Sequence, residues 1–151
     1  MKKQKYHQGS WTPKHPNKYD GDFTKIFYRS SWELKFMNWC DNNSAVLLWS
    51  SEETVVPYRS PVDMKPHRYF LDFKIKVSSN AGIKTYLVEI KPSSQRIPPK
   101  IPKRNSKRYL IECSTFMVNQ AKWEAATRWA KDRGWEFIVL DEFDLGIQQR
   151  K

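Results

Sequence analysis

Cysteine is scarce in this chain of 151 residues, which contains only Cys40 and Cys113. The two residues are far apart, and neither belongs to a group with the short spacing of a zinc site. They therefore indicate reduced thiols in a cytosolic protein rather than a disulfide framework, and they argue against zinc.

A long hydrophobic run is also lacking. No apolar segment approaches the ~18 residues that a membrane span requires, and polar residues rather than a signal-peptide core follow Met1–Lys5. Neither a basic amphipathic helix nor a lipid anchor is present. A membrane surface is therefore a poorer candidate partner for this protein than nucleic acid.

Acidic residues are outnumbered, because 16 Asp and Glu stand against 27 Lys and Arg, giving a formal net charge of +11. Such an excess favours polyanions, since neutralising phosphates releases condensed counterions. Hydrophobic residues make up 39% of the chain and aromatic residues 15%, enough for the core of one compact domain. The composition predicts a single domain that binds nucleic acid.

The first predicted helix covers residues 31–40. Trp32, Phe36 and Trp39 recur there at the spacing of one helix face. Ser30 can cap the helix, because a serine oxygen accepts hydrogen bonds from the first free amides.

Five later segments have the composition or the alternation of β-strands: 45–49, 55–58, 69–77, 85–91 and 135–140. Apolar and polar residues alternate in 69–77 and 85–91, with turn-forming residues 78–82 between them. These two strands are therefore predicted to form an antiparallel hairpin.

The segment between the hairpin and the last strand divides into a loop and a helix. Residues 92–108 carry four prolines among six Lys or Arg, which predicts a basic loop. A long helix is predicted over 115–133, with Gly134 ending it. Trp123 and Trp129 on this helix are expected to pack in the core. The order of elements predicts an α/β layered domain.

Residues 1–27 form a predicted basic amino-terminal arm, ahead of a domain over 28–151. The arm is rich in Pro, Lys and Tyr without a sustained period, and we expect order only where Trp11, Phe23 or Phe27 docks. Its cations are Lys2, Lys3, Lys5, Lys14 and Lys18.

The hairpin carries a candidate active site. Alternate residues of a strand share a face, so Glu89 and Lys91 point the same way, and Asp72 lies across the strand pair at ~5 Å. Two carboxylates suit Mg²⁺, and an adjacent lysine can position or deprotonate a water. From spacing alone, an ordinary cross-strand ion pair is favoured by roughly two to one, since perturbed carboxylates are only probabilistic site markers.

A family resemblance favours the catalytic interpretation. Leu71-Asp72 followed by Glu89-Ile90-Lys91 resembles the motif of the PD-(D/E)xK nuclease superfamily, with leucine in place of the usual proline. Residues 67–73 resemble the strand that leads to the metal aspartate in TnsA-type transposase nucleases. Asn119, Lys122-Trp123 and residues 134–137 resemble the second helix and last strand of that group. The resemblance implies a restriction-endonuclease-like core, in which helices flank a mixed central sheet.

Within that group, residues 28–145, including the segment Tyr58–Asp63, are similar to the head completion nucleases of T-even-type phages. The similarity implies a Mg²⁺-dependent nuclease, with Mn²⁺ as a substitute, that cuts double-stranded DNA endo- and exonucleolytically during head completion before head–tail joining. It implies portal or neck proteins as partners, no membrane, and a location in the bacterial host cytoplasm or the virion. No base-reading motif is present, so we expect cleavage to be sequence-tolerant.

The resemblance assigns catalytic roles to Glu33, Asp72, Glu89 and Lys91. Asp72 and Glu89 would bind the metal, and Lys91 would be the base or charge-stabilising group. Glu33 has two open interpretations: it is a further metal ligand, or it completes a capping box in which it accepts from the Ser30 N–H.

The predicted DNA contacts are cationic: Arg68, Arg96, Lys100, Lys103, Arg104, Lys107, Arg108 and Lys122. The alternative to DNA contact is that each of these charged side chains only keeps the protein soluble. Lys122 is equally well explained as an exposed helix lysine. Gln95, four residues after Lys91, either approaches substrate or is a solvated loop residue.

Two rival functions remain. A non-catalytic DNA-binding assembly protein on the same fold is the second hypothesis, and the presence of all three motif residues argues against it. A single-stranded RNA-binding module ranks last, because RRM and KH signatures are lacking.

Overall fold

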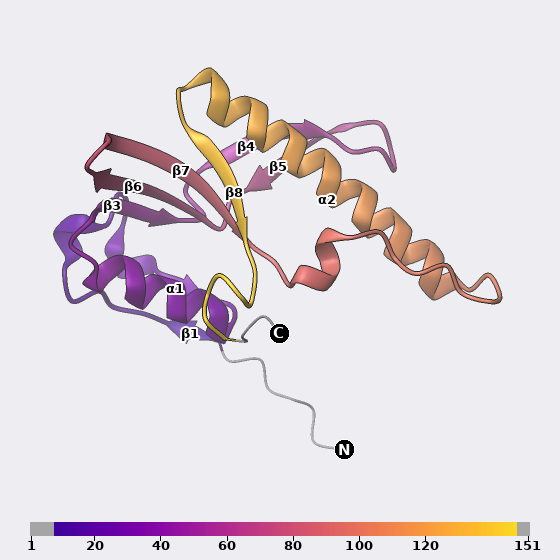
Figure 1. Ribbon diagram of the computed structural model, residues 1–151, viewed down its shortest axis with the longest axis horizontal. Helices are drawn as coiled ribbons and strands as arrows, with labels where there is room; N and C mark the ends of the chain where they lie inside the picture. Colours follow the sequence, from indigo (N-terminus) through magenta and orange to yellow (C-terminus); the bar gives the residue numbers. More distant parts are fainter. Residues whose placement is uncertain (1–7, 148–151) are drawn as a thin grey trace, which may run out of the picture.

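The structure is a computed structural model that describes residues 8–147. A four-stranded sheet lies at its centre in the order β3-β6-β7-β8 (Figure 1). The strands are β3 (Val46–Ser51), β6 (Phe73–Ser79), β7 (Gly82–Ile90) and β8 (Glu136–Leu140). Neighbours pair antiparallel except β7 and β8, which are parallel. The mixed sheet confirms the predicted fold class.

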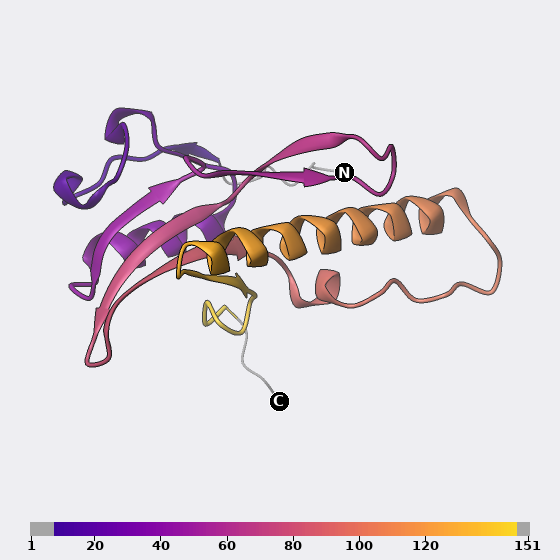
Figure 2. The same cartoon turned by 90° about the horizontal axis from the view of Figure 1, so that it is seen from above.

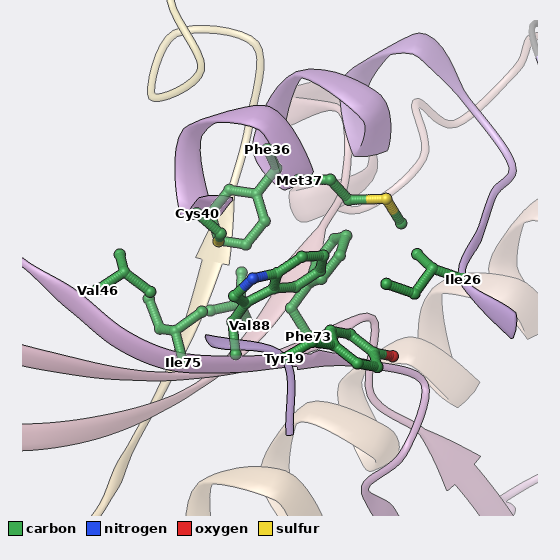
Figure 3. Close-up of a cluster of buried hydrophobic side chains, with 10 residues drawn as sticks. Tyr19, Ile26, Phe36, Met37, Cys40, Val46, Phe73, Ile75 and Val88 are labelled. Carbon is green, nitrogen blue, oxygen red and sulfur yellow. The ribbon is translucent and has the colours of Figure 1, made fainter. Parts of the chain in front are cut away.

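Helix α1 (Ser31–Asn42) packs on one face of the sheet. Figure 3 shows Phe36, Met37 and Cys40 of this helix directed toward Phe73 of β6. The predicted helix face was only partly right, because Phe36 is buried as expected but Trp39 is 46% exposed. The buried stripe is Glu33, Phe36, Met37 and Cys40, rotated from the aromatic one. This rotation brings Glu33 inward.

Helix α2 (Lys107–Asp132) packs on the opposite face of the sheet. Its buried Ala126 and Ala130 pack in one cluster with Leu87 of β7, and the small side chains allow close approach. Trp123 and Trp129 are partly buried in the same cluster, which confirms their predicted role in packing.

Helix α2 begins eight residues earlier than predicted. The Ser106 side chain caps it by accepting a hydrogen bond from the Tyr109 N–H at 3.1 Å. The first turns were missed because they are not amphipathic: Leu110 and Ile111 are both exposed. Lys107 and Arg108 therefore lie on the helix, and the preceding segment contains the 3-10 helix η3 (Ser93–Arg96). Gly134, with a φ of +73°, follows the helix as expected.

The predicted strand 69–77 is two strands. β5 (Pro66–Phe70) pairs with β4 (Val55–Arg59) in a separate two-stranded sheet, whereas β6 pairs with β3 and β7. The chain leaves one sheet for the other at Leu71-Asp72, a change that unbroken alternation cannot reveal. The hairpin of β6 and β7 itself is confirmed.

Residues 8–27 lie against α1 and β3. They contain β1 (Gly9–Ser10), paired with β2 (Phe27–Tyr28), and two 3-10 helices, η1 (Pro16–Lys18) and η2 (Phe23–Lys25). Tyr19 and Ile26 belong to the core (Figure 3), whereas Phe23 and Phe27 are largely exposed. The Trp11 ring meets Trp49 edge-on, with centroids 5.6 Å apart.

The Lys18 ammonium ties this segment to α1 by donating to three main-chain carbonyls at the end of the helix, those of Cys40, Asp41 and Asn43. Lys2, Lys3 and Lys5 of the predicted arm lie outside the described residues. No helix within residues 8–147 has the length and apolarity needed to cross a bilayer.

Candidate active site

The β6–β7 hairpin sets Asp72 opposite Glu89. Phe73 pairs with Val88 and Lys74 with Leu87, so one further step of the same register joins positions 72 and 89. The Ile90 N–H donates to Asp72 Oδ2 at 2.8 Å, which fixes the aspartate against β7. The expected cross-strand pairing of these two carboxylates is therefore present.

The break between β5 and β6 shapes the site. Leu71 is fully buried, and its N–H donates to the Thr54 carbonyl at 3.0 Å. The Asp72 carbonyl accepts from the Glu52 N–H at 3.1 Å. Because the turn after β3 holds both peptide groups, the Asp72 side chain projects at the junction of the two sheets, where it is only partly exposed.

Glu89 is held on both sides. The Tyr69 hydroxyl donates to Glu89 Oε2 at 2.7 Å, and Lys91 Nζ lies 3.9 Å from Oε1. Glu89 is 7% exposed, so these contacts leave its carboxylate little freedom. Lys91 retains partial exposure, and its N–H donates to the Leu140 carbonyl of β8 at 2.9 Å.

Lys122 projects from α2 toward the same place. Its ammonium lies 5.5 Å from the centroid of the Tyr69 ring and 5.8 Å from that of Tyr58. It is half-buried, and its charge lowers the pKa of Glu89. Of the two interpretations of Lys122, the structure therefore places it beside the site rather than on a solvated helix face.

Glu33 forms only half of the predicted capping box. Its N–H donates to Ser30 Oγ at 3.1 Å, and its Oε2 accepts from the Arg29 N–H at 2.8 Å. The prediction had the Ser30 N–H as the donor to the Glu33 carboxylate, whereas the observed donor is the N–H of the preceding residue, Arg29. The charge of Glu33 also raises the pKa of Asp72, so the two carboxyl groups interact electrostatically.

Electrostatics set the acidic groups apart from ordinary surface carboxylates. Burial and the charge of Glu89 raise the pKa of Asp72 well above its usual range. Burial also raises the pKa of Glu89, against the opposing effects of the Tyr69 hydroxyl and Lys91. The pKa of Glu33 is raised by burial and by the nearby charges of Glu52 and Glu89.

This arrangement fits a divalent cation in its charge and its chemistry. Burial and the charge of Glu89 raise the pKa of Asp72, and Lys91 and Lys122 only partly offset the effect of burial on Glu89. A bound cation would relieve this repulsion, and Mg²⁺ commonly binds proteins through one or two carboxylates plus water and phosphate oxygens. Asp72 and Glu89 supply that minimal set. Within residues 8–147, no three His, Cys, Asp or Glu side chains are close enough together to form a metal cage of their own.

The predicted DNA-contacting cations fall into different environments. Arg96 forms an ion pair with buried Asp141, with Nη1 3.0 Å from Oδ2, so its charge holds η3 in place. Arg108 pairs with Glu112 along α2 at 3.0 Å. Arg68 is exposed on β5. The remaining cations, Lys100, Lys103, Arg104 and Lys107, are exposed before or at the start of α2.

The sequence did not identify three residues that contact or flank the site: Tyr69, Glu52 and Arg29. Tyr69 looked like a core residue because it shares the apolar alternation, and only the strand break turns its hydroxyl to Glu89. Glu52, with a positive φ of 56°, forms an ion pair with Arg29 at 2.8 Å. No sequence signal marks these contacts, because they join a turn, a helix start and a strand.

Comparison with known proteins identifies the class to which this site belongs. The model of the TnsA-like endonuclease N-terminal family matches residues 43–142, which include Asp72, Glu89 and Lys91 but not Glu33. The chain belongs to this TnsA-like endonuclease family. It is also similar to the head completion nuclease of Enterobacteria phage T4, with 40% identity over 143 residues that cover 92% of this chain and 93% of that protein. No solved structure matches the chain significantly.

Proposed function

We propose that this protein is a Mg²⁺-dependent deoxyribonuclease that hydrolyses phosphodiester bonds of double-stranded DNA. The observation that carries the proposal is the pair of crowded carboxylates, Asp72 and Glu89, on adjacent strands with Lys91 Nζ 3.9 Å from Glu89. Both carboxylates would hold the ion, for which Mn²⁺ would substitute. When bound, the ion would polarise the scissile phosphate and lower the pKa of a water molecule.

The surrounding residues orient these groups. The Ile90 N–H and the Tyr69 hydroxyl each occupy one carboxylate oxygen, Oδ2 of Asp72 and Oε2 of Glu89. The other two oxygens, Oδ1 of Asp72 and Oε1 of Glu89, would bind the cation, with Lys91 Nζ 3.9 Å from Oε1. Lys91 is partly exposed beside Glu89, where its ammonium can orient the attacking water or stabilise charge developing on the phosphate.

Glu33 is the third acidic group in this proposal. Its Oε2 accepts from the Arg29 N–H, so Oε1 would approach the ion directly or through water. The cap and the ligand role are then compatible, because each uses a different oxygen.

DNA would run from this site across the cationic segment that precedes α2. Lys100, Lys103, Arg104 and Lys107 are exposed there. Lys122 beside Tyr69 and exposed Arg68 on β5 would add further phosphate contacts. Such contacts to phosphates position a backbone without reading sequence. Cleavage would therefore be sequence-tolerant, and both endo- and exonucleolytic.

The first test is cleavage of supercoiled plasmid and of end-labelled linear DNA with Mg²⁺ or with EDTA. Nicking of the circle requires endonuclease activity, whereas loss of label from the linear ends reports exonuclease activity. If the protein only retards both DNAs, with Mn²⁺ as well, the non-catalytic assembly protein is the better account.

The biological role follows from the T4 relative, whose name assigns it to head completion. We propose the same role here, in the host cytoplasm or on the virion, with portal or neck proteins as partners before head–tail joining. Purified protein would be added to DNA-filled heads made without it, followed by tails. A rise in infectious particles with the wild type but not with Asp72→Asn supports the role. Equal numbers with both would contradict it.

A further inference from the structure

A cleft of about 520 Å³ lies between η3 with its following segment and the amino-terminal half of α2. In Figure 2 the segment after η3 runs alongside this half of the helix. Six of the lining residues carry the argument: Gln95, Ile97, Pro99, Ile111, Phe116 and Asn119. The cleft adjoins the carboxylate site, because η3 follows Lys91 almost directly and Asn119 lies one helical turn before Lys122.

Asn119 is the most informative residue of the cleft. It is only 6% exposed, yet its side-chain amide forms no hydrogen bond with another group among residues 8–147. Its amide atoms are not among the fully buried polar atoms without a partner in the described residues, so the amide is open to the cleft that it lines. An amide offers a donor and an acceptor side by side, which matches the edge of a nucleobase.

The rest of the lining suits a nucleotide, which has a flat base and a charged sugar–phosphate group. Phe116 lies one turn from Asn119 on the same wall, and Ile97, Pro99 and Ile111 add apolar surface. Aromatic side chains stack on bases of any identity. Arg108 is a lining residue, and exposed Lys100 directly follows Pro99 of the lining, so cations are available there for sugar–phosphate groups.

The η3 wall of the cleft is held in place before any ligand binds. The Arg96–Asp141 ion pair and two hydrogen bonds from Ser93 to Glu142 tie η3 to the turn after β8. A site that is already ordered loses less entropy on binding.

From these observations we propose that the cleft binds one unpaired nucleobase of the DNA strand whose phosphate lies at Asp72 and Glu89. The inference rests on the proposed nuclease function and specifies its substrate. DNA with unpaired nucleotides, such as a bulge, a frayed end or a single strand, would be preferred over an intact duplex, because a paired base must first leave its stack.

The test measures binding in EDTA, so that it does not depend on cleavage. The probes are two short duplexes of equal length, one fully paired and one with a single bulged 2-aminopurine. We expect the bulged duplex to bind about tenfold more tightly, the scale of one base–aromatic stack, with a change in 2-aminopurine fluorescence.

Substitutions in the cleft test whether the cleft causes the preference for the bulged duplex. Phe116→Leu and Asn119→Ala should remove most of the preference, whereas Gln120→Ala, the exposed amide one residue further on, should keep it. Because Asn119 is buried, Gln95→Ala on the exposed wall is included, and it should weaken the preference without changing thermal unfolding.

Equal affinity for the two duplexes, or a preference unaffected by all three cleft variants, would overturn the inference. The proposed function fails separately: a protein that prefers the bulge but never cuts with Mg²⁺ contradicts the nuclease, whereas one that cuts without preference contradicts only the cleft.

Discussion

Asp72 illustrates how a single residue combines a cost in stability with a role in chemistry. Its pKa is raised, first by burial and then by the charge of Glu89. A carboxyl group whose folded pKa lies above its unfolded value contributes stability below the unfolded pKa, and that contribution is lost as pH rises through the folded pKa. At neutral pH without metal, the ionised Asp72 therefore destabilises the fold.

The first prediction is that Asp72→Asn raises the thermal midpoint of the metal-free protein at neutral pH. One unit of pKa shift corresponds to about 1.4 kcal/mol, or ~2–4 °C for a domain of this size. The gain should shrink as pH falls toward ~4, where the wild-type group is protonated. Mg²⁺ should stabilise the wild type but not the variant. Exposed Asp132→Asn is the matched control. A lower midpoint for Asp72→Asn at neutral pH would contradict this account.

Tyr69 acts through Glu89 and is a positioning residue. Its hydroxyl donates to Glu89 Oε2 and lowers the pKa of that carboxyl. Tyr69→Phe should therefore raise the pKa of Glu89 and move the acid limb of the pH–rate profile for DNA cleavage to higher pH. Tyr58→Phe, which removes a neighbouring hydroxyl that makes no contact with Glu89, should leave the limb in place. A profile unchanged by Tyr69→Phe would refute the positioning role.

At the scale of elements, two substitutions at the start of α1 distinguish whether Glu33 is a helix cap, a metal ligand or both. Ser30→Ala removes the oxygen that accepts from the Glu33 N–H and should cost ~1 kcal/mol of stability, with little effect on cleavage. Glu33→Gln keeps an acceptor for the Arg29 N–H but removes the charge, so it should raise the Mg²⁺ concentration needed for half-maximal cleavage. The measurements are thermal unfolding and a Mg²⁺ titration of the rate. If Glu33→Gln changes only stability, Glu33 is a cap alone.

The order of elements and the central hairpin could be predicted from the sequence. Alternation along each strand and the turn residues 78–82 are local signals, so the antiparallel hairpin and the nearness of Asp72 and Glu89 could be predicted from them. The switch between sheets at Leu71 could not be predicted, because it depends on which strands pair with each half, a long-range property that leaves the alternation unchanged.

In the helices, too, some features could be predicted from the sequence and others could not. Ser30 was a recognisable cap, but the inward face of α1 was not the aromatic one, since Trp39 is exposed and Glu33 is buried. The early start of α2 at Lys107 was missed because its first turns bury little. Local signals located the start of α1 and the end of α2, whereas the start of α2 and the inward face of α1 depend on packing against the rest of the molecule.

At the scale of the whole molecule, the net charge of +11 predicts salt-sensitive binding to DNA. Replacing Lys100, Lys103 and Arg104 by Gln should lower the slope of log affinity against log salt by about 2.7, since each phosphate contact contributes about 0.9 on duplex DNA. Lys76→Gln with Lys84→Gln, at the end of the hairpin away from Asp72, is the control and should change the slope little. Filter binding over a range of salt concentrations measures it. An unaltered slope in the triple variant would place the DNA elsewhere.

The central claim is that Asp72 and Glu89 hold a divalent ion for DNA hydrolysis. The most direct test follows the rate of plasmid nicking across a Mg²⁺ titration for wild type, Asp72→Asn and Asp132→Asn, with gel-shift binding measured in parallel. We predict saturable, EDTA-sensitive nicking by wild type and Asp132→Asn, and loss of nicking by Asp72→Asn with DNA binding retained. Wild-type nicking rates in Asp72→Asn at every Mg²⁺ concentration would contradict the assignment of the site.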